Sequence, residues 1–158
     1  MLQQALDFKA ENDALYELLK PLSDADFERK TLFKDWTIND VMQHLHYFNY
    51  AAHLSLDDED GILKLLADLR AAGEKGEEMV PYTDRMLDGV RGQALLKLWH
   101  DYYENMIGDY EGVDPKKRLK WAGPDMSVLS SVTARLMETW SHAQAIYDVL
   151  GTVRQDRD

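Results

Sequence analysis

Glu138 and His142 are the residues whose types and spacing first suggest chemistry. They lie four positions apart, so in a helix both side chains project from one face, one turn apart. Their neighbours on that flank are small (Ser131, Ala134 and Ala145), which leaves room for a ligand. A carboxylate and an imidazole so placed can bind one divalent metal ion. The alternative is a surface Glu–His pair worth a few tenths of a kcal/mol, so a metal site needs further ligands from elsewhere.

The segment 130–151 is predicted to be the helix that carries this pair. Its apolar residues recur at steps of three and four positions, as in an amphipathic helix. They are Leu129, Val132, Leu136, Trp140, Ala143, Tyr147 and Leu150. Gly151 stands where a glycine commonly ends a helix. Arg135, Glu138 and Asp148 are the only charged residues between 126 and 150, so we expect this helix to be enclosed on most sides.

Four other histidines could complete a metal site: His44, His46, His53 and His100. In a helix, His46 and His53 lie on the flank opposite His44, so one helix cannot offer both sets to a single ion. His44 has the better surroundings, because its flank is small or apolar and includes Phe48. His100 follows a tryptophan in another helix and could also face inward. Each of the four has the alternative of being a hydrogen-bonded structural histidine.

The elements that must position these residues are all predicted to be helical. Long helices are expected over 2–20, from 38 to about 56, over 93–110 and from about 126 to 150, with a shorter one over 62–69 and short pieces between 79 and 92. Thr37 and Asp40 form a capping-box pattern at the start of the second helix, which we expect to end in the acidic run 57–60. We find no convincing strand and no internal repeat. The predicted fold class is all-α, a four-helix bundle with additional short helices.

Composition limits the classes of partner. A formal charge of −11 over 158 residues argues against binding to nucleic acid or to anionic membranes, both of which require basic surfaces. There is no run of eighteen apolar residues, and the N-terminal segment is too polar for a signal peptide. We therefore expect a cytoplasmic protein. It contains no cysteine, so any thiol chemistry would need a thiol supplied as a small molecule.

Two segments carry a family resemblance. Residues 35–45, DWTINDVMQHL, resemble the signature W-T-[VI]-x-D-x-x-x-H-L of the N-terminal domain of mycothiol-dependent maleylpyruvate isomerase. That domain belongs to the DinB/YfiT-like metal-binding four-helix bundles. Residues 121–151, including RLMETWSH, resemble a closely related subfamily of uncharacterised proteins. The resemblance implies a bundle over 1–151 and a tail over 152–158, with the family's second, C-terminal domain absent.

The resemblance also implies a ligand set of His44, Glu138 and His142. Zinc is the expected ion, and nickel, manganese and iron remain open. It further implies isomerase or transferase chemistry on a small-molecule substrate, with a low-molecular-weight thiol as cosubstrate or water in its place. The alternatives are a binding module without turnover, for example a homodimer, and a purely structural bundle.

Two charged residues near the implied ligands each have two interpretations. Arg135 is the candidate catalytic residue, because it could hold an anionic group of the substrate or orient the carboxylate of Glu138. Alternatively, it forms a salt bridge with an acidic loop. Asp40 could support His44 from behind, although its place in the capping box favours a structural role. An arginine of the 85–91 stretch is a second candidate for holding a substrate carboxylate.

Overall fold

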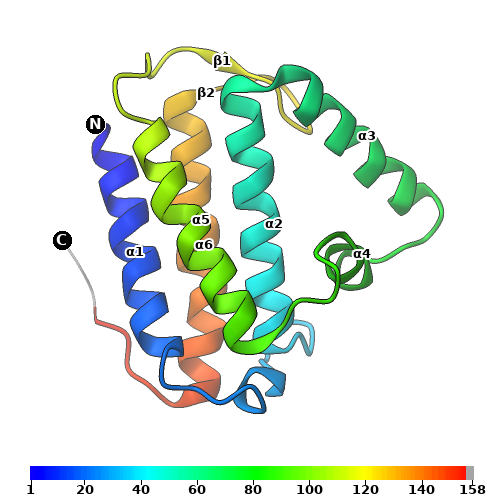
Figure 1. Cartoon of the computed structure of the whole chain (residues 1–158), viewed down its shortest axis with the longest axis vertical. Coiled ribbons are helices and arrows are strands. Elements are labelled where there is room, and N and C mark those ends of the chain that lie inside the picture. Colours follow the sequence, from blue (N-terminus) through cyan, green and yellow to red (C-terminus); the bar gives the residue numbers. More distant parts are fainter. Residues whose placement is uncertain (156–158) are drawn as a thin grey trace.

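The apolar stripes of the sequence form four long helices that lie side by side in a computed structural model, which describes residues 1–155 (Figure 1). The elements are α1 (Gln3–Leu19), η1 (Asp26–Glu28), α2 (Ile38–Asp57), α3 (Glu59–Glu74), α4 (Met79–Met86), α5 (Gly92–Asp109), β1 (Arg118–Leu119), β2 (Met126–Ser127) and α6 (Val128–Leu150). Helices α1 and α2 each pack against both α5 and α6, while α3 and α4 pack on the outside of α2. The predicted all-α four-helix bundle with short additional helices is confirmed.

Side-chain caps set where the central helices begin. The Thr37 hydroxyl accepts from the Asp40 amide at 3.1 Å, and the Asp40 carboxylate accepts from the Thr37 amide at 2.8 Å. This capping box confirms the structural role of Asp40 and fixes the register of α2. Ser127 caps α6 in a similar way by accepting from the Ser130 amide at 3.0 Å.

Two expectations about secondary structure were wrong. Helix α3 begins at Glu59 and runs to Glu74, well beyond the predicted 62–69. The reason is Asp58, whose carboxylate accepts from the Gly61 amide at 2.9 Å and starts a new helix inside the acidic run. A short antiparallel pair of strands, β1 and β2, also exists just before α6. Each has only two residues, too few to show an alternating pattern.

The final helix is less enclosed than its low charge suggested. Met137 is 53% exposed and Trp140 is 49% exposed, so both lie on the outer face of α6. The buried face carries Val132, Thr139 and Ala143 instead. The low charge of α6 therefore does not mean that it is buried, because many of its exposed residues are uncharged.

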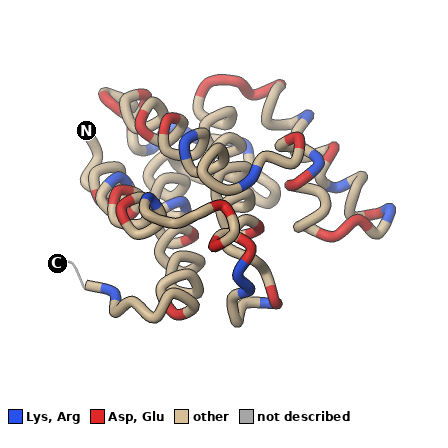
Figure 2. Tube along the Cα trace, turned by 60° about the horizontal axis from the view of Figure 1, so that its bottom comes forward, with Lys and Arg blue, Asp and Glu red and all other residues tan. Residues whose placement is uncertain are grey.

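The chain after α6 forms no further regular element among the described residues. Gly151 adopts the left-handed conformation (φ 66°) and ends α6 as predicted. Of the tail expected over 152–158, residues 156–158 lie outside the described residues. Acidic side chains occur on many elements rather than in one patch (Figure 2). Within the described part of the chain, no helix combines the length and the apolar composition needed to cross a bilayer.

Candidate metal centre

The structure brings His44 of α2 together with Glu138 and His142 of α6. The same carboxylate oxygen, Glu138 Oε2, lies 3.3 Å from His44 Nε2 and 3.2 Å from His142 Nε2. One donor atom from each of the three residues lies within 4.8 Å of the others. The predicted trio therefore forms a single cluster across the α2–α6 interface.

The spacing of these atoms suits a shared cation. Bonds of about 2.0–2.2 Å to nitrogen and oxygen ligands place neighbouring ligand atoms about 3–3.5 Å apart. The two nitrogen–oxygen distances in the cluster fall in this range. Two imidazoles and one carboxylate are also a donor set that leaves further coordination positions open. Two of the three ligand pairs therefore already have the spacing of atoms that share a divalent ion.

Aromatic side chains surround the two imidazoles. The Trp36 ring stacks on His142 at an interplanar angle of 6° and a centroid distance of 6.0 Å, and Phe33 meets His142 edge-on at 5.1 Å. Phe48, one turn after His44 on α2, lies 4.8 Å from the His44 ring. These contacts leave the His44 and His142 side chains only 13% and 15% exposed, whereas Glu138 is 43% exposed. The cluster is therefore walled by aromatic rings and reaches solvent mainly beside the carboxylate.

The loop before α2 places two of these rings. Thr31 is buried, and its amide and hydroxyl both donate to the Trp36 carbonyl, at 2.7 and 2.8 Å. Lys34 and Asp35 take the left-handed conformation, with φ of 52° and 58°, which reverses the chain without a glycine. This tight turn holds Phe33 and Trp36 against the imidazoles.

The cluster holds Glu138 and His44 in the charge states that a cation needs. Hydrogen bonds from His142 and His44 hold the pKa of the Glu138 carboxyl well below its usual range. Burial lowers the pKa of His44, and this outweighs the opposing effect of Glu138. At neutral pH the carboxylate is charged and the His44 imidazole is neutral, the forms in which both bind metals.

Arg135 lies one turn before Glu138, and its side chain is buried. It is 3% exposed, and its Nε donates to Asn49 Oδ1 of α2 at 3.1 Å. Burial lowers its pKa to about 10, so it remains charged at neutral pH. Among residues 1–155 it forms no ion pair with an acidic loop, so that alternative was wrong. Its suggested contact with substrate stays a prediction.

The remaining histidines lie outside the cluster. His53 bonds to the Tyr102 hydroxyl through Nδ1 at 2.9 Å and to Asp109 through Nε2 at 2.8 Å. His46 is buried and meets Tyr102 edge-on. His100 packs against Tyr16 at a centroid distance of 4.1 Å. His100 also faces the buried Tyr103 ring at 5.3 Å. All three therefore have structural contacts, the alternative given for each of them, and none joins the cluster of His44, Glu138 and His142.

The arginines of the 85–91 stretch are also engaged elsewhere. Arg85 forms a two-pronged ion pair with Glu77, with nitrogen–oxygen distances of 3.0 and 2.8 Å. Arg91 donates to Asp84 at 2.8 Å and lies 3.7 Å from Glu28. Neither guanidinium is therefore a free positive group for a substrate.

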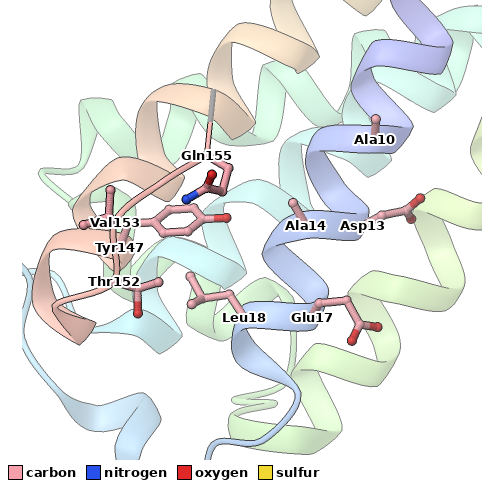
Figure 3. Close-up of a pocket in the computed structure, with 9 residues that line it drawn as sticks. All are labelled: Ala10, Asp13, Ala14, Glu17, Leu18, Tyr147, Thr152, Val153 and Gln155. Carbon is pink, nitrogen blue, oxygen red and sulfur yellow. The ribbon is translucent and has the colours of Figure 1, made fainter. Parts of the chain in front are cut away.

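A surface pocket of about 650 Å³ lies elsewhere, between α1 and the chain that follows α6 (Figure 3). It is lined by Ala10, Asp13, Ala14, Glu17, Leu18, Tyr147, Thr152, Val153 and Gln155. One of its two acidic residues, Asp13, accepts hydrogen bonds from Lys9 at 2.9 Å and from the Tyr103 hydroxyl at 2.9 Å. None of the three clustered residues lines this pocket, so the candidate centre is a separate feature.

Two residues of the centre were missed in the sequence. Phe33 belongs to a loop with no periodic pattern, and only the fold shows that it reaches His142. Asn49 is fully buried on α2, and an amide among apolar helix positions was a signal that could have identified it. Trp36 and Trp121 pack against core clusters, whereas Trp140, which the apolar stripe placed on the inner face, lies at the rim.

Comparison with known proteins identifies the family of the chain. Residues 8–147 match the family described as "Mycothiol maleylpyruvate isomerase N-terminal domain". Two uncharacterized proteins of Mycobacterium tuberculosis, from strains CDC 1551 / Oshkosh and H37Rv, are each 32% identical to the chain over 148 residues. The alignments cover 94% of the chain and 56% of each relative, so the chain spans about half the length of the curated relatives it matches. No solved structure gives a significant match.

Proposed function

The chain belongs to the DinB/YfiT-like family of mycothiol maleylpyruvate isomerase N-terminal domains, and from this premise we propose that it is a metal-dependent enzyme. The proposed ligands are His44, Glu138 and His142, with zinc as the expected ion. The observation that carries the proposal is the convergence of two imidazole nitrogens and one carboxylate oxygen within 4.8 Å.

Two features support the proposed reaction class: the solvent-exposed side of the site beside Glu138, and the absence of cysteine from the sequence. A divalent ion held by three protein ligands lowers the pKa of a thiol or water bound beside it. The chain has no cysteine, so the thiol would be a low-molecular-weight cosubstrate. We propose isomerase or transferase chemistry on a small unsaturated acid, of the kind that the family's description names.

The protein's own residues would bind and shield the reactants. Phe33, Trp36 and Phe48 enclose the imidazoles and exclude water from that side. Glu138 is partly exposed and faces the side from which a reactant would enter. The alignments cover only 56% of each relative, so the rest of a relative's chain has no counterpart in this site. The identity of the substrate is therefore proposed along with the reaction class.

Metal binding is tested directly by titrating chelator-treated protein with Zn²⁺ in a calorimeter. Wild-type protein should bind one ion, and His44→Ala or His142→Ala should weaken binding at least about a hundredfold, because each removes a direct ligand. His53→Ala is the matched control, since it removes an imidazole of the same helix that lies outside the cluster. Equal binding by all four proteins would refute the assignment.

Turnover is tested with the metal-loaded protein, maleylpyruvate and a low-molecular-weight thiol such as mycothiol. The expected result is thiol-dependent isomerisation that disappears in His142→Ala and persists in His53→Ala. Metal binding without turnover of this or related unsaturated acids would instead support a metal-containing binding module.

A further inference from the structure

A buried positive charge with no ion-pair partner among residues 1–155 lies beside the candidate metal centre. Arg135 is 3% exposed, and its Nη2 has no hydrogen-bond partner among the described residues. Its Nε donates to Asn49, a neutral amide, at 3.1 Å. A buried guanidinium is ordinarily paired with a carboxylate, because an unpaired charge in a core is costly.

Asn49 is the side chain that leaves this charge unbalanced. Its Oδ1 accepts from Arg135, but its Nδ2 has no partner in the described chain. An aspartate at the same position would keep the acceptor and would lose no hydrogen bond at the second atom. It would also pair with the guanidinium. The asparagine thus preserves the hydrogen bond while leaving the positive charge in place.

The field of this charge reaches the candidate centre. Arg135 precedes Glu138 by three positions, one turn along the same face of α6. Glu138 is the acidic side chain whose charge acts on Arg135, yet the two form no ion pair within the 4.0 Å limit among the described residues. Glu138 instead points its carboxylate at the two imidazoles. Arg135 therefore acts on the centre through space, from inside the protein.

We propose that Arg135 is a positioning residue whose uncompensated positive charge makes the metal centre prefer anionic ligands to neutral ones. Asn49 leaves this charge uncompensated because its side chain is neutral. This inference rests on the proposed function. A divalent ion with one carboxylate ligand carries one net positive charge, and Arg135 adds a second nearby. The ligand class that benefits is a small anion, either a thiolate or a carboxylate. The same charge weakens binding of the metal ion itself.

The size of the effect is measurable. At an effective dielectric constant of about 20, a unit charge within about 10 Å of a bound ion changes the binding of that ion by about tenfold or more. The direction separates this role from simple packing. Damage to the core would weaken metal binding, whereas loss of a repelling charge strengthens it.

The test compares wild-type protein with Asn49→Asp, both loaded with Co²⁺ and followed by visible absorption. Acetate and 2-mercaptoethanol supply a carboxylate and a thiolate, and imidazole is the neutral ligand. In Asn49→Asp we expect Co²⁺ to bind at least about tenfold more tightly. Affinity for both anions relative to imidazole should fall about tenfold. A fall for only one anion identifies that group as the ligand class the charge selects.

Two further variants keep the test decisive. Asn105→Asp makes the same change in net charge on the exposed surface of α5 and should alter neither quantity. Arg135→Met removes the charge itself and should change both quantities in the same direction as Asn49→Asp, so it replaces that variant if Asn49→Asp fails to fold. An unchanged anion-to-imidazole ratio, or weaker Co²⁺ binding, overturns this inference while leaving the proposed function standing. Failure of wild-type protein to bind Co²⁺ overturns both.

Discussion

His46 lies in the core with 5% of its surface exposed, edge-on to the Tyr102 ring, and burial lowers its pKa to about 4. His44 is also shifted downward by burial, but it has Glu138 as a partner. Two positions along one helix thus separate a histidine that can bind a ligand from one that only fills the core. The two should be distinguishable by their effects on stability in acid.

We expect His46 to make the metal-free protein sensitive to acid. The native state keeps His46 neutral, while the unfolded chain takes up a proton below pH about 6.5, so acid favours unfolding. Between pH 7 and pH 4 this lowers the free energy of unfolding by about 3 kcal/mol. Urea unfolding in the presence of chelator should show this loss in wild-type protein. It should be smaller in His46→Phe, which keeps the ring contact with Tyr102.

The matched control is His100→Gln, which removes a histidine from a partly exposed position. Its stability should fall between pH 7 and pH 4 as steeply as that of the wild type. An identical acid response in His46→Phe and wild-type protein would contradict the buried, neutral state of His46.

At the residue scale, the ligand trio could be predicted and its surroundings could not. Glu138 and His142 share a face because of helix geometry alone, and the resemblance supplied His44. Phe33 needed the fold, since a loop phenylalanine has no pattern that names its partner. Asn49 carried a signal, an amide among apolar helix positions, but only the fold shows that it contacts Arg135. The burial of Arg135 was equally hidden, because a charged residue off the apolar stripe is normally solvent-exposed.

At the scale of elements, α2 depends on its first turn. The Thr37–Asp40 capping box satisfies two amides that the helix cannot pair by itself. The same turn connects the loop that carries Trp36 to the helix that carries His44. Stability and site geometry are therefore coupled at this junction.

Thr37→Ala should lower the free energy of unfolding by about 1 kcal/mol, because it removes the side-chain acceptor of the cap. Thr37→Ser is the control and should stay near wild type, since it keeps the hydroxyl. Chemical denaturation at neutral pH measures both. If Thr37→Ala is as stable as Thr37→Ser, the cap contributes nothing to the fold.

Helix boundaries were predictable where a cap and a stripe agreed. Helix α2 was expected over 38 to 56 and ends at Asp57, because its capping box and apolar period coincide. The length of helix α3 was underestimated, since the acidic run that ends α2 also contains Asp58, the cap from which α3 begins at Glu59. The turn over 31–36 gave no glycine signal, because Lys34 and Asp35 adopt the left-handed conformation themselves.

At the scale of the whole molecule, the core and the candidate centre are largely separate. The main apolar cluster joins α1, α2, α5 and α6 around Trp99, which is fully buried. The centre lies at one interface only, between α2 and α6, and none of its three ligands belongs to that cluster. Removing a bound ion should therefore weaken the fold without abolishing it.

Chelation should lower the melting temperature while leaving the helices intact at 25 °C. An ion that binds only the native state, at a thousandfold excess over its Kd, stabilises it by about 4 kcal/mol. For a domain of this size that corresponds to a shift of about 10 °C. Thermal unfolding followed by circular dichroism, with and without chelator, measures the shift, and the spectrum at 25 °C should not change. His142→Ala should melt at the same temperature in both conditions, because it has no site to empty. Wild-type protein that contains metal by elemental analysis, yet melts identically with and without chelator, would contradict an ion that stabilises the α2–α6 interface.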